Sequence, residues 1–207
     1  MRTLSWILAI ACFLSFAARA QGQSDDVKQW SFSLSLGGTF VPQDQDIESA
    51  TLTADRNDLH LEARYNYEDR NTGSIWIGPT FHVGENWTLD ATPMFGAIFG
   101  NTSGIAPGWE LTVSHRWLEI YSETEFVYNI KAAGANFYYN WSEIAIVPAD
   151  RFQFGVAIER TKLYRTRLGV QRGLFFRVSV RRVELTAYVM NLVWESPTEQ
   201  LTATIHF

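Results

Sequence analysis

The stretch Leu201-Thr202-Ala203-Thr204-Ile205-His206-Phe207 alternates apolar and polar side chains and ends on an aromatic ring. Strict alternation of this kind gives a β-strand one apolar face and one polar face. About a dozen segments of similar length repeat the pattern from Trp30 onward. A closed barrel in a lipid bilayer accounts for such repeated amphipathic strands, so the sequence predicts an all-β protein, a closed antiparallel transmembrane β-barrel.

Residues 1–20 have the composition of a cleaved signal peptide. Arg2 precedes an apolar run at 4–17, and Ala18 and Ala20 occupy the positions that a signal peptidase reads. The run is shorter than the roughly 20 residues that span a bilayer, which disfavours a retained membrane helix. Acylation at the single cysteine, Cys12, is a less favoured alternative. We expect cleavage after Ala20, which leaves residues 21–207 as one barrel domain without disulfides.

The charge of the chain excludes one class of partner. The sequence has 17 basic and 22 acidic residues, and loss of Arg2 and Arg19 with the leader leaves 15 basic residues against the same 22 acidic ones. Such a net-negative chain argues against nucleic-acid binding.

Turn-forming residues divide the mature chain into period-two segments. Most segments reach the about 9–11 residues of one tilted crossing, and 47–54 is marginal. An even number of strands places both chain ends in the periplasm. The predicted connections include a loop from Gly100 to Gly108. We predict twelve strands, with ten as the alternative, at 29–40, 47–54, 59–69, 73–83, 87–99, 107–116, 118–130, 135–147, 151–162, 166–180, 183–194 and 198–207.

Aromatic side chains gather at the ends of these predicted strands, as amphipathic rings do at the two membrane interfaces. The periplasmic ends carry Trp30, Trp87, Trp117, Phe152 and Phe207. The outer ends carry Phe40, Tyr65, Tyr67, Phe99, Trp109, Tyr128, Phe137 and Tyr139. Two ring belts favour a membrane barrel over a soluble antiparallel sandwich.

Parity assigns the face of each side chain. Pro79 and Pro93 fall inside predicted strands, where we expect a bulge or a local distortion. A change of phase in 135–147 predicts another bulge near Ser142 and Glu143. In the strand at 59–69, lipid should meet Leu59, Leu61, Ala63, Tyr65 and Tyr67, and the interior should receive His60, Glu62, Arg64, Asn66 and Glu68.

With its leader, alternating strands, ring belts and final strand, the chain resembles Gram-negative outer-membrane β-barrel proteins. The resemblance implies that the barrel assembly machinery reads the terminal signal Leu201, Ala203, Ile205 and Phe207. In length and strand number the chain is similar to the small twelve-stranded porins for acidic oligosaccharides. The inner walls of those porins carry tracks of arginine, whereas this wall mixes both signs.

Charged side chains predicted to line the lumen form two groups. The acidic group is Glu110, Glu119, Glu123 and Glu125, and the basic group is Arg64, Arg151, Arg177 and Arg182. Opposite walls of opposite sign would create a transverse field for passing solutes. Alternatively, the groups pair into a network that plugs the barrel, because twelve strands lie between the filled and the open sizes.

A basic hairpin at the outer edge is the predicted contact with lipopolysaccharide phosphates, to which guanidinium groups donate paired hydrogen bonds. A solvated loop without this role is an equal alternative. The hairpin contains Arg160, Lys162, Arg165, Arg167 and Arg172.

Two possible chemical sites are weak. His60 and His82 should pair across a hairpin near Asp90, but they can equally be polar lumen residues, and we predict no metal and no cofactor. Ser114 and His115 are adjacent and so lie on opposite strand faces, which argues against an enzyme. We expect a narrow passive channel for small hydrophilic solutes, with a sealed structural or adhesive barrel and a lipid-modifying enzyme as alternatives.

Overall fold

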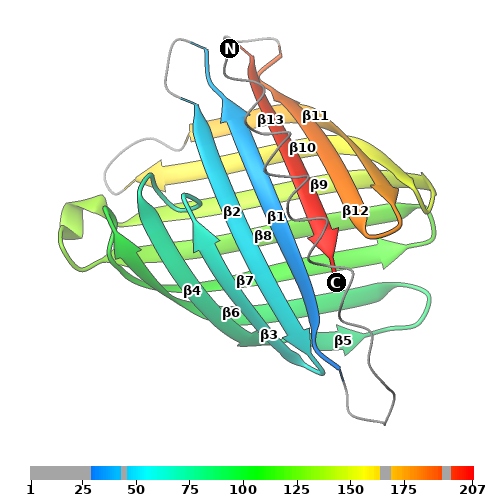
Figure 1. Ribbon diagram of the computed structural model, residues 1–207, viewed down its shortest axis with the longest axis horizontal. Helices are drawn as coiled ribbons and strands as arrows, with labels where there is room; N and C mark the ends of the chain where they lie inside the picture. Colours follow the sequence, from blue (N-terminus) through cyan, green and yellow to red (C-terminus); the bar gives the residue numbers. More distant parts are fainter. Residues whose placement is uncertain (1–28, 43–45, 164–168, 193–196) are drawn as a thin grey trace.

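The computed structural model describes residues 29–42, 46–163, 169–192 and 197–207, so the predicted signal peptide with Cys12 lies outside the described residues. One antiparallel sheet contains every described strand (Figure 1). The strands are β1 (Ser31–Phe40), β2 (Ile47–Arg56), β3 (Leu59–Tyr65), β4 (Thr72–Pro79), β5 (Phe81–Val83), β6 (Thr88–Gly100), β7 (Gly104–His115), β8 (Leu118–Asn129), β9 (Phe137–Ala149), β10 (Phe152–Leu163), β11 (Gly169–Val180), β12 (Val183–Met190) and β13 (Thr198–His206).

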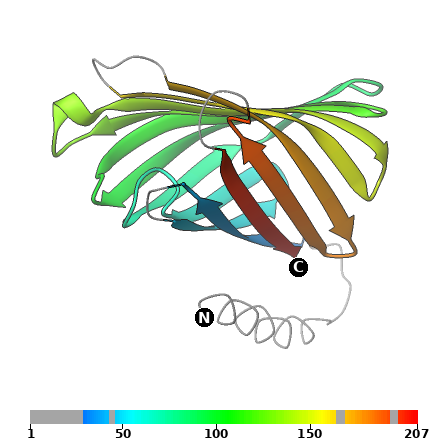
Figure 2. The same ribbon diagram turned by 90° about the horizontal axis from the view of Figure 1, so that it is seen from above.

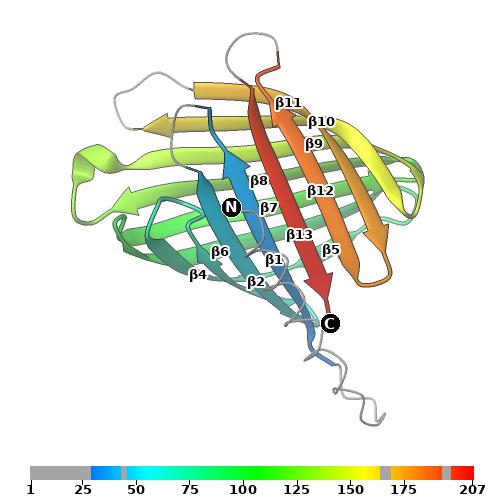
Figure 3. The same ribbon diagram turned by 45° about the horizontal axis from the view of Figure 1, so that its top comes forward.

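The sheet closes on itself where the first strand meets the last. β1 pairs with β13, and the backbone N–H groups of Phe32 and Phe207 donate to each other's carbonyls at 2.9 Å. Figures 2 and 3 show the sheet curving round until β1 (blue) lies beside β13 (red). β4 and β5 both pair with β6 as two pieces of one strand, so the barrel has twelve strands, as predicted. We call the end where β1 begins and β13 ends the terminal end, and the opposite end the loop end.

Helical structure is minimal in the described part of the chain. One 3-10 turn, η2 (Ala133–Ala135), lies between β8 and β9. Among the described residues, no helix has the length and apolarity to cross a bilayer.

The two prolines interrupt pairing without shifting it. β4 stops at Pro79, β5 resumes two residues later, and both keep the same register on β6, which places Pro79 opposite Pro93. Neither proline has an N–H to donate to the ladder. The N–H of Thr80 donates instead to the carbonyl of Asp58 at 2.7 Å. The expected local distortion is therefore a gap between β4 and β5.

The predicted bulge at Ser142 and Glu143 is wrong. Both residues pair in unbroken register with β8 and β10, and the register shift of β9 lies near the turn, between Phe152 and Phe154. The apolar residues change from one face of β9 to the other because large apolar side chains fill part of the interior. The backbone itself has no bulge at this point. Inward positions near the loop end of β9 hold large rings that fill the barrel, whereas the exposed outward positions nearer the terminal end are Ile144 and Ile146.

Three of the predicted belt rings, Tyr67, Phe137 and Tyr139, point inward. β3 ends at Tyr65, before the predicted end at 69, and Asn66 takes a left-handed φ of 54°. This turn breaks the alternation and directs Tyr67 into the barrel. The Gly100–Gly108 loop is also shorter than predicted, because β7 already begins at Gly104. Rings exposed on the outer surface include Phe40, Tyr65, Phe99, Trp109, Tyr128, Trp87, Trp117, Phe152 and Phe207.

Large side chains fill one side of the interior. Two buried clusters contain Trp76, Met94, Ile98, Ala106, Val127 and Phe137, and Trp141, Ala145, Ala157, Phe175, Tyr188 and Met190. These residues come from β4 and from β6 to β12. The inward positions of β1, β2 and β13 are mostly serine, threonine and glycine, so the unfilled space lies against those three strands.

Trp76 is the central ring of the first cluster and is 3% exposed. Its ring lies over Gly96, where an added Cβ would approach it to 2.6 Å. We expect Trp76→Phe to reduce the free energy of unfolding by about 1–2 kcal/mol, because packing volume and the Nε1 hydrogen bonds to Glu68 and Ser74 are lost. Urea unfolding in detergent measures this change. Trp109→Phe is the matched control on the outer surface and should cost less than about 1 kcal/mol; equal losses would contradict the packing argument.

Candidate functional site in the barrel lumen

A cavity of about 970 Å³ lies inside the barrel. Along β1 it is lined by every second residue, Ser33, Ser35, Gly37 and Thr39, and then by Val41 beyond the end of the strand. These positions cover most of β1, and Ser31 at its start lines a separate, smaller cavity. The larger cavity therefore extends along most of the barrel wall.

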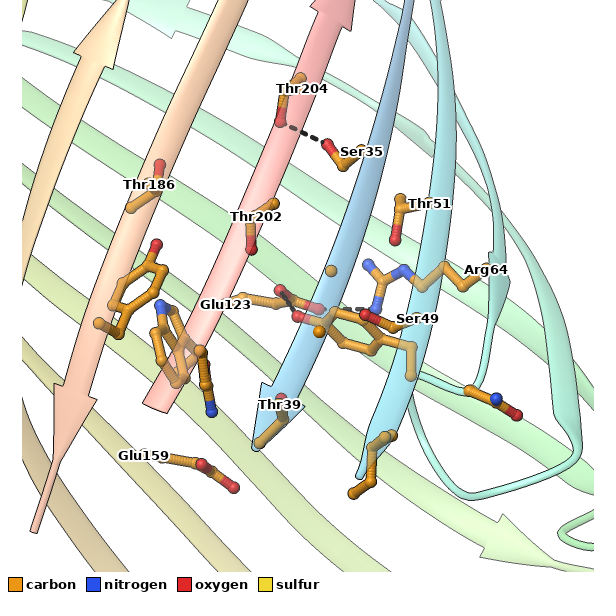
Figure 4. A pocket seen from close by; sticks show the side chains of 18 of the residues that line it. Ser35, Thr39, Ser49, Thr51, Arg64, Glu123, Glu159, Thr186, Thr202 and Thr204 are labelled. Atoms are coloured by element: carbon orange, nitrogen blue, oxygen red, sulfur yellow. Dashed lines mark hydrogen bonds and ion pairs between the residues drawn. The ribbon is translucent and has the colours of Figure 1, made fainter. Parts of the chain in front are cut away.

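Short hydroxyl side chains form one side of this cavity. We call this surface the hydroxyl wall, and Figure 4 shows part of it. Ser35 and Thr204 are joined by a hydrogen bond of 2.8 Å, and Ser33 and Thr53 by one of 2.6 Å. Their mutual pairing keeps the side chains close to the sheet. The hydroxyl wall comprises Ser33, Ser35, Thr39, Ser49, Thr51, Thr53, Thr198, Thr202 and Thr204.

Carboxylates dominate the charged part of the lining. Nine acidic side chains line the cavity against three guanidinium groups, so the lumen has a strong negative excess. The acidic residues are Glu62, Glu68, Asp69, Glu110, Glu119, Glu123, Glu143, Glu159 and Glu184, and the arginines are Arg64, Arg70 and Arg177.

Arg64 is the centre of the larger ion-pair cluster and is 5% exposed. Its Nη1 donates to Glu123 Oε1 at 2.6 Å and to Glu125 Oε2 at 3.5 Å. Its Nε donates to Glu62 Oε2 at 2.5 Å. The guanidinium also lies 4.6 Å from the ring centre of Tyr67, within cation–π range. One cation thus joins carboxylates from β3 and β8 across the interior.

The loop at 66–71 folds into the barrel rather than away from it. The Tyr67 hydroxyl donates to Glu123 Oε2 at 2.5 Å. Glu68 accepts from Ser74 Oγ at 2.5 Å, and Asp69 accepts from the Thr102 hydroxyl at 2.9 Å. Sequence reasoning missed this loop. The polar run at 66–71 was the available signal that β3 ends before residue 69.

Arg177 is the centre of a second cluster. Its Nη2 donates to Glu143 Oε2 at 2.8 Å, and its Nη1 donates to Gln153 Oε1 at 2.9 Å. Glu184 Oε1, across the turn that follows β11, lies 3.4 Å from its Nε. The hydroxyl of Tyr188 donates to Glu143 Oε1 at 2.7 Å.

The predicted acidic and basic groups are placed differently. Glu110, Glu119 and Glu123 line the cavity, and Glu125 is buried beside Arg64. Arg151 and Arg182 lie in exposed turns at the terminal end. The prediction that they line the lumen is wrong because the alternation of side chains does not continue past the ends of the strands. Arg182 lines only a small cavity at that mouth. A basic wall facing an acidic one does not form among the described residues.

The predicted rim hairpin is described in part. Arg160 lies on the outer face of β10, where its Nη1 donates to Asn140 Oδ1 at 2.6 Å. Arg172 is exposed on β11, and Lys162 belongs to β10. Arg165 and Arg167 lie outside the described residues.

The terminal signal residues Leu201, Ala203, Ile205 and Phe207 share the outer side of the last strand. Leu201 and Phe207 are exposed there, and the ring of Phe207 stacks on Phe32 at 5.9 Å. The final strand therefore presents its apolar face to the surroundings.

The histidines do not form the predicted pair. His60 lies opposite Gly78, four residues before His82. His82 is exposed and bonds Asp90 at 2.7 Å. His115, which follows Ser114 on β7, bonds a backbone carbonyl and stacks on a tryptophan ring.

No family model and no curated protein sequence matches the chain. Solved structures do match it. A structure described as "KdgM porin" has a TM-score of 0.64 at 12% identity, covering 84% of this chain and 99% of that one. "NanC porin" has a TM-score of 0.56 at 9% identity, covering 85% and 98%. The chain therefore has the closed twelve-stranded barrel fold of outer-membrane porins.

Proposed function

We propose that this protein is a passive outer-membrane channel for small hydrophilic solutes and that it favours cations over anions. The observation that carries the proposal is the cavity that follows β1 from Ser33 to Val41, along most of the strand. The negative excess of its lining supports the cation preference, since a charged, narrow lumen concentrates counter-ions.

The acidic lining also separates this chain from one of its structural neighbours. A matched structure is described as "KdgM porin in complex with disordered oligogalacturonate", with a TM-score of 0.65 at 11% identity. An acidic sugar chain would meet repulsion from the carboxylates in this lumen. We infer that neutral or cationic solutes are the class that this channel passes.

Conductance of single channels in planar bilayers tests the proposal. We expect steady ohmic steps from the wild type and a reduction of at least about half from Thr51→Trp, because an indole would then enter the cavity opposite the charged lining. Leu52→Trp is the matched control, since Leu52 is exposed on the outer face. A folded wild type that is silent, or equal conductance in both variants, would reject the channel and leave the sealed barrel.

We also propose that the outer rim binds lipopolysaccharide phosphates. Arg160 is held outward by Asn140 and Arg172 is exposed on the neighbouring strand. Replacing both arginines by serine should weaken retention of lipopolysaccharide about tenfold, because charge-assisted hydrogen bonds are lost. Phosphate analysis of the purified protein measures the retained lipid. Replacing Arg151 and Arg182, at the other end, is the control; unchanged retention in the rim variant would refute the proposal.

A further inference from the structure

A histidine and two carboxylates converge on one point of the lumen wall. Ligand atoms of His60, Glu62 and Glu110 all lie within 4.8 Å of one another. His60 and Glu62 project from β3, and Glu110 projects from β7, which is separated from β3 by β4 and β6 in the sheet. All three residues line the cavity. An ion in the lumen could therefore reach the point where they meet.

His60 is already oriented as a metal ligand would be. Its Nδ1 lies 2.6 Å from Asp55 Oδ1, and we assign the ring proton to this bond because the carboxylate can only accept. The lone pair is then on Nε2, which lies 3.1 Å from Glu62 Oε1. Apart from this contact, Nε2 is buried without a hydrogen-bond partner among the described residues, in a side chain that is 10% exposed. A carboxylate behind an imidazole is the usual outer support of protein metal sites.

The charge around this point favours a cation. Arg64 is the only arginine that the ion pairs of Glu62 and Glu110 include among the described residues, and it also pairs with Glu123 and Glu125. One guanidinium cannot balance four carboxylates. A divalent ion held by Glu62 and Glu110 would supply positive charge where it is lacking.

We propose that His60, Glu62 and Glu110 bind a divalent transition-metal ion, such as Zn²⁺ or Mn²⁺, at the surface of the lumen. An imidazole with carboxylates suits these ions, whereas Mg²⁺ and Ca²⁺ take oxygen ligands. Bonds of about 2.0–2.2 Å require the ligand atoms to approach to about 3.4 Å, which small side-chain rotations can provide. On the side that faces the cavity, the bound ion would have a free coordination position for water. The proposal goes beyond the channel and does not depend on conduction.

Calorimetric titration of ZnCl₂ into the chelator-treated, detergent-folded protein, prepared without a histidine tag, tests the site. We expect one saturable Zn²⁺ equivalent in the wild type and none with MgCl₂. His60→Ala and the nearly isosteric Glu110→Gln should each remove the saturable phase. Asp55→Ala should weaken binding about 10- to 100-fold, because Asp55 positions His60 without contacting the metal.

His82→Ala is the matched control, because it removes an exposed histidine that also pairs with an aspartate. This variant should bind Zn²⁺ as the wild type does. Circular dichroism and heat-modifiable migration show which variants fold, and Mn²⁺ paramagnetic resonance gives an independent signal of binding. Absence of saturable binding in the wild type, binding that survives in folded Glu110→Gln, or loss in His82→Ala would each overturn the proposal. A silent channel that still binds Zn²⁺ would leave it intact.

Discussion

Replacing Arg64 by methionine should lower the free energy of unfolding by about 3–5 kcal/mol, because the carboxylates that surround the guanidinium would remain buried without their cation. Methionine retains much of the side-chain volume, so the loss reports charge rather than a cavity. Urea unfolding in detergent, followed by tryptophan fluorescence, measures the change.

Two further variants separate charge from general damage. Arg151→Met removes an exposed arginine of a turn and should alter stability by no more than about 0.5 kcal/mol. Adding Glu123→Gln to Arg64→Met should recover about 1 kcal/mol or more, since it removes one of the uncompensated charges. A double variant no more stable than Arg64→Met would show that the cluster does not stabilise the barrel through its charges.

Inverting two lumen charges should reverse or strongly reduce ion selectivity. Glu119 and Glu159 both line the cavity, and neither forms an ion pair with an arginine among the described residues. Glu119→Lys with Glu159→Lys therefore changes the lining by four charge units at little structural cost. Four charges at about 10 Å, screened at 0.1 M salt, amount to about 0.6 kcal/mol for a monovalent ion. Cation passage would fall about threefold and anion passage would rise about threefold.

Reversal potentials in a KCl gradient measure the permeability ratio, which should shift by nearly an order of magnitude. The control is Glu85→Lys with Asp150→Lys, which changes net charge equally at exposed positions outside the cavity lining. A shift as large in the control as in the lumen variant would mean that the mouth, rather than the lumen, selects the ions.

The strands and their faces could be predicted because every second residue of a membrane-barrel strand faces lipid and is apolar. Ile75 and Ile77 lie exposed on the outer surface, and Trp76 between them is buried, as the alternation of the sequence requires. The predicted bulge and the predicted end of one strand were wrong because the alternation of apolar and polar residues there does not follow the geometry of the backbone. The rings inside β9 imitate a bulge, and the left-handed Asn66 ends β3 before the pattern does.

The site was harder to predict than the fold. The alternation of side chains shows whether a residue faces the lumen or the outside. It does not show how far along the barrel axis the residue lies, or which side chain lies opposite it across the lumen. Glu62 and Glu110 meet only because closure brings β3 and β7 near each other. The serines and threonines of β1, β2 and β13 were visible in the sequence, yet their meaning depends on the bulky groups that fill the other side.

The half of the barrel that is packed with large side chains and the half that is lined by hydroxyl groups have different roles. The packed half stabilises the barrel, and the hydroxyl-lined half sets the width of the cavity. Aromatic rings and ion pairs stabilise the barrel on one side, whereas β1, β2 and β13 contribute only small side chains to the interior. Substituents of graded size at Ser35, Thr51 or Thr202 could therefore tune the aperture while the packed half stays untouched. If the proposed channel conducts, the same substitutions would change its diameter in small steps and make the barrel a scaffold for engineered nanopores.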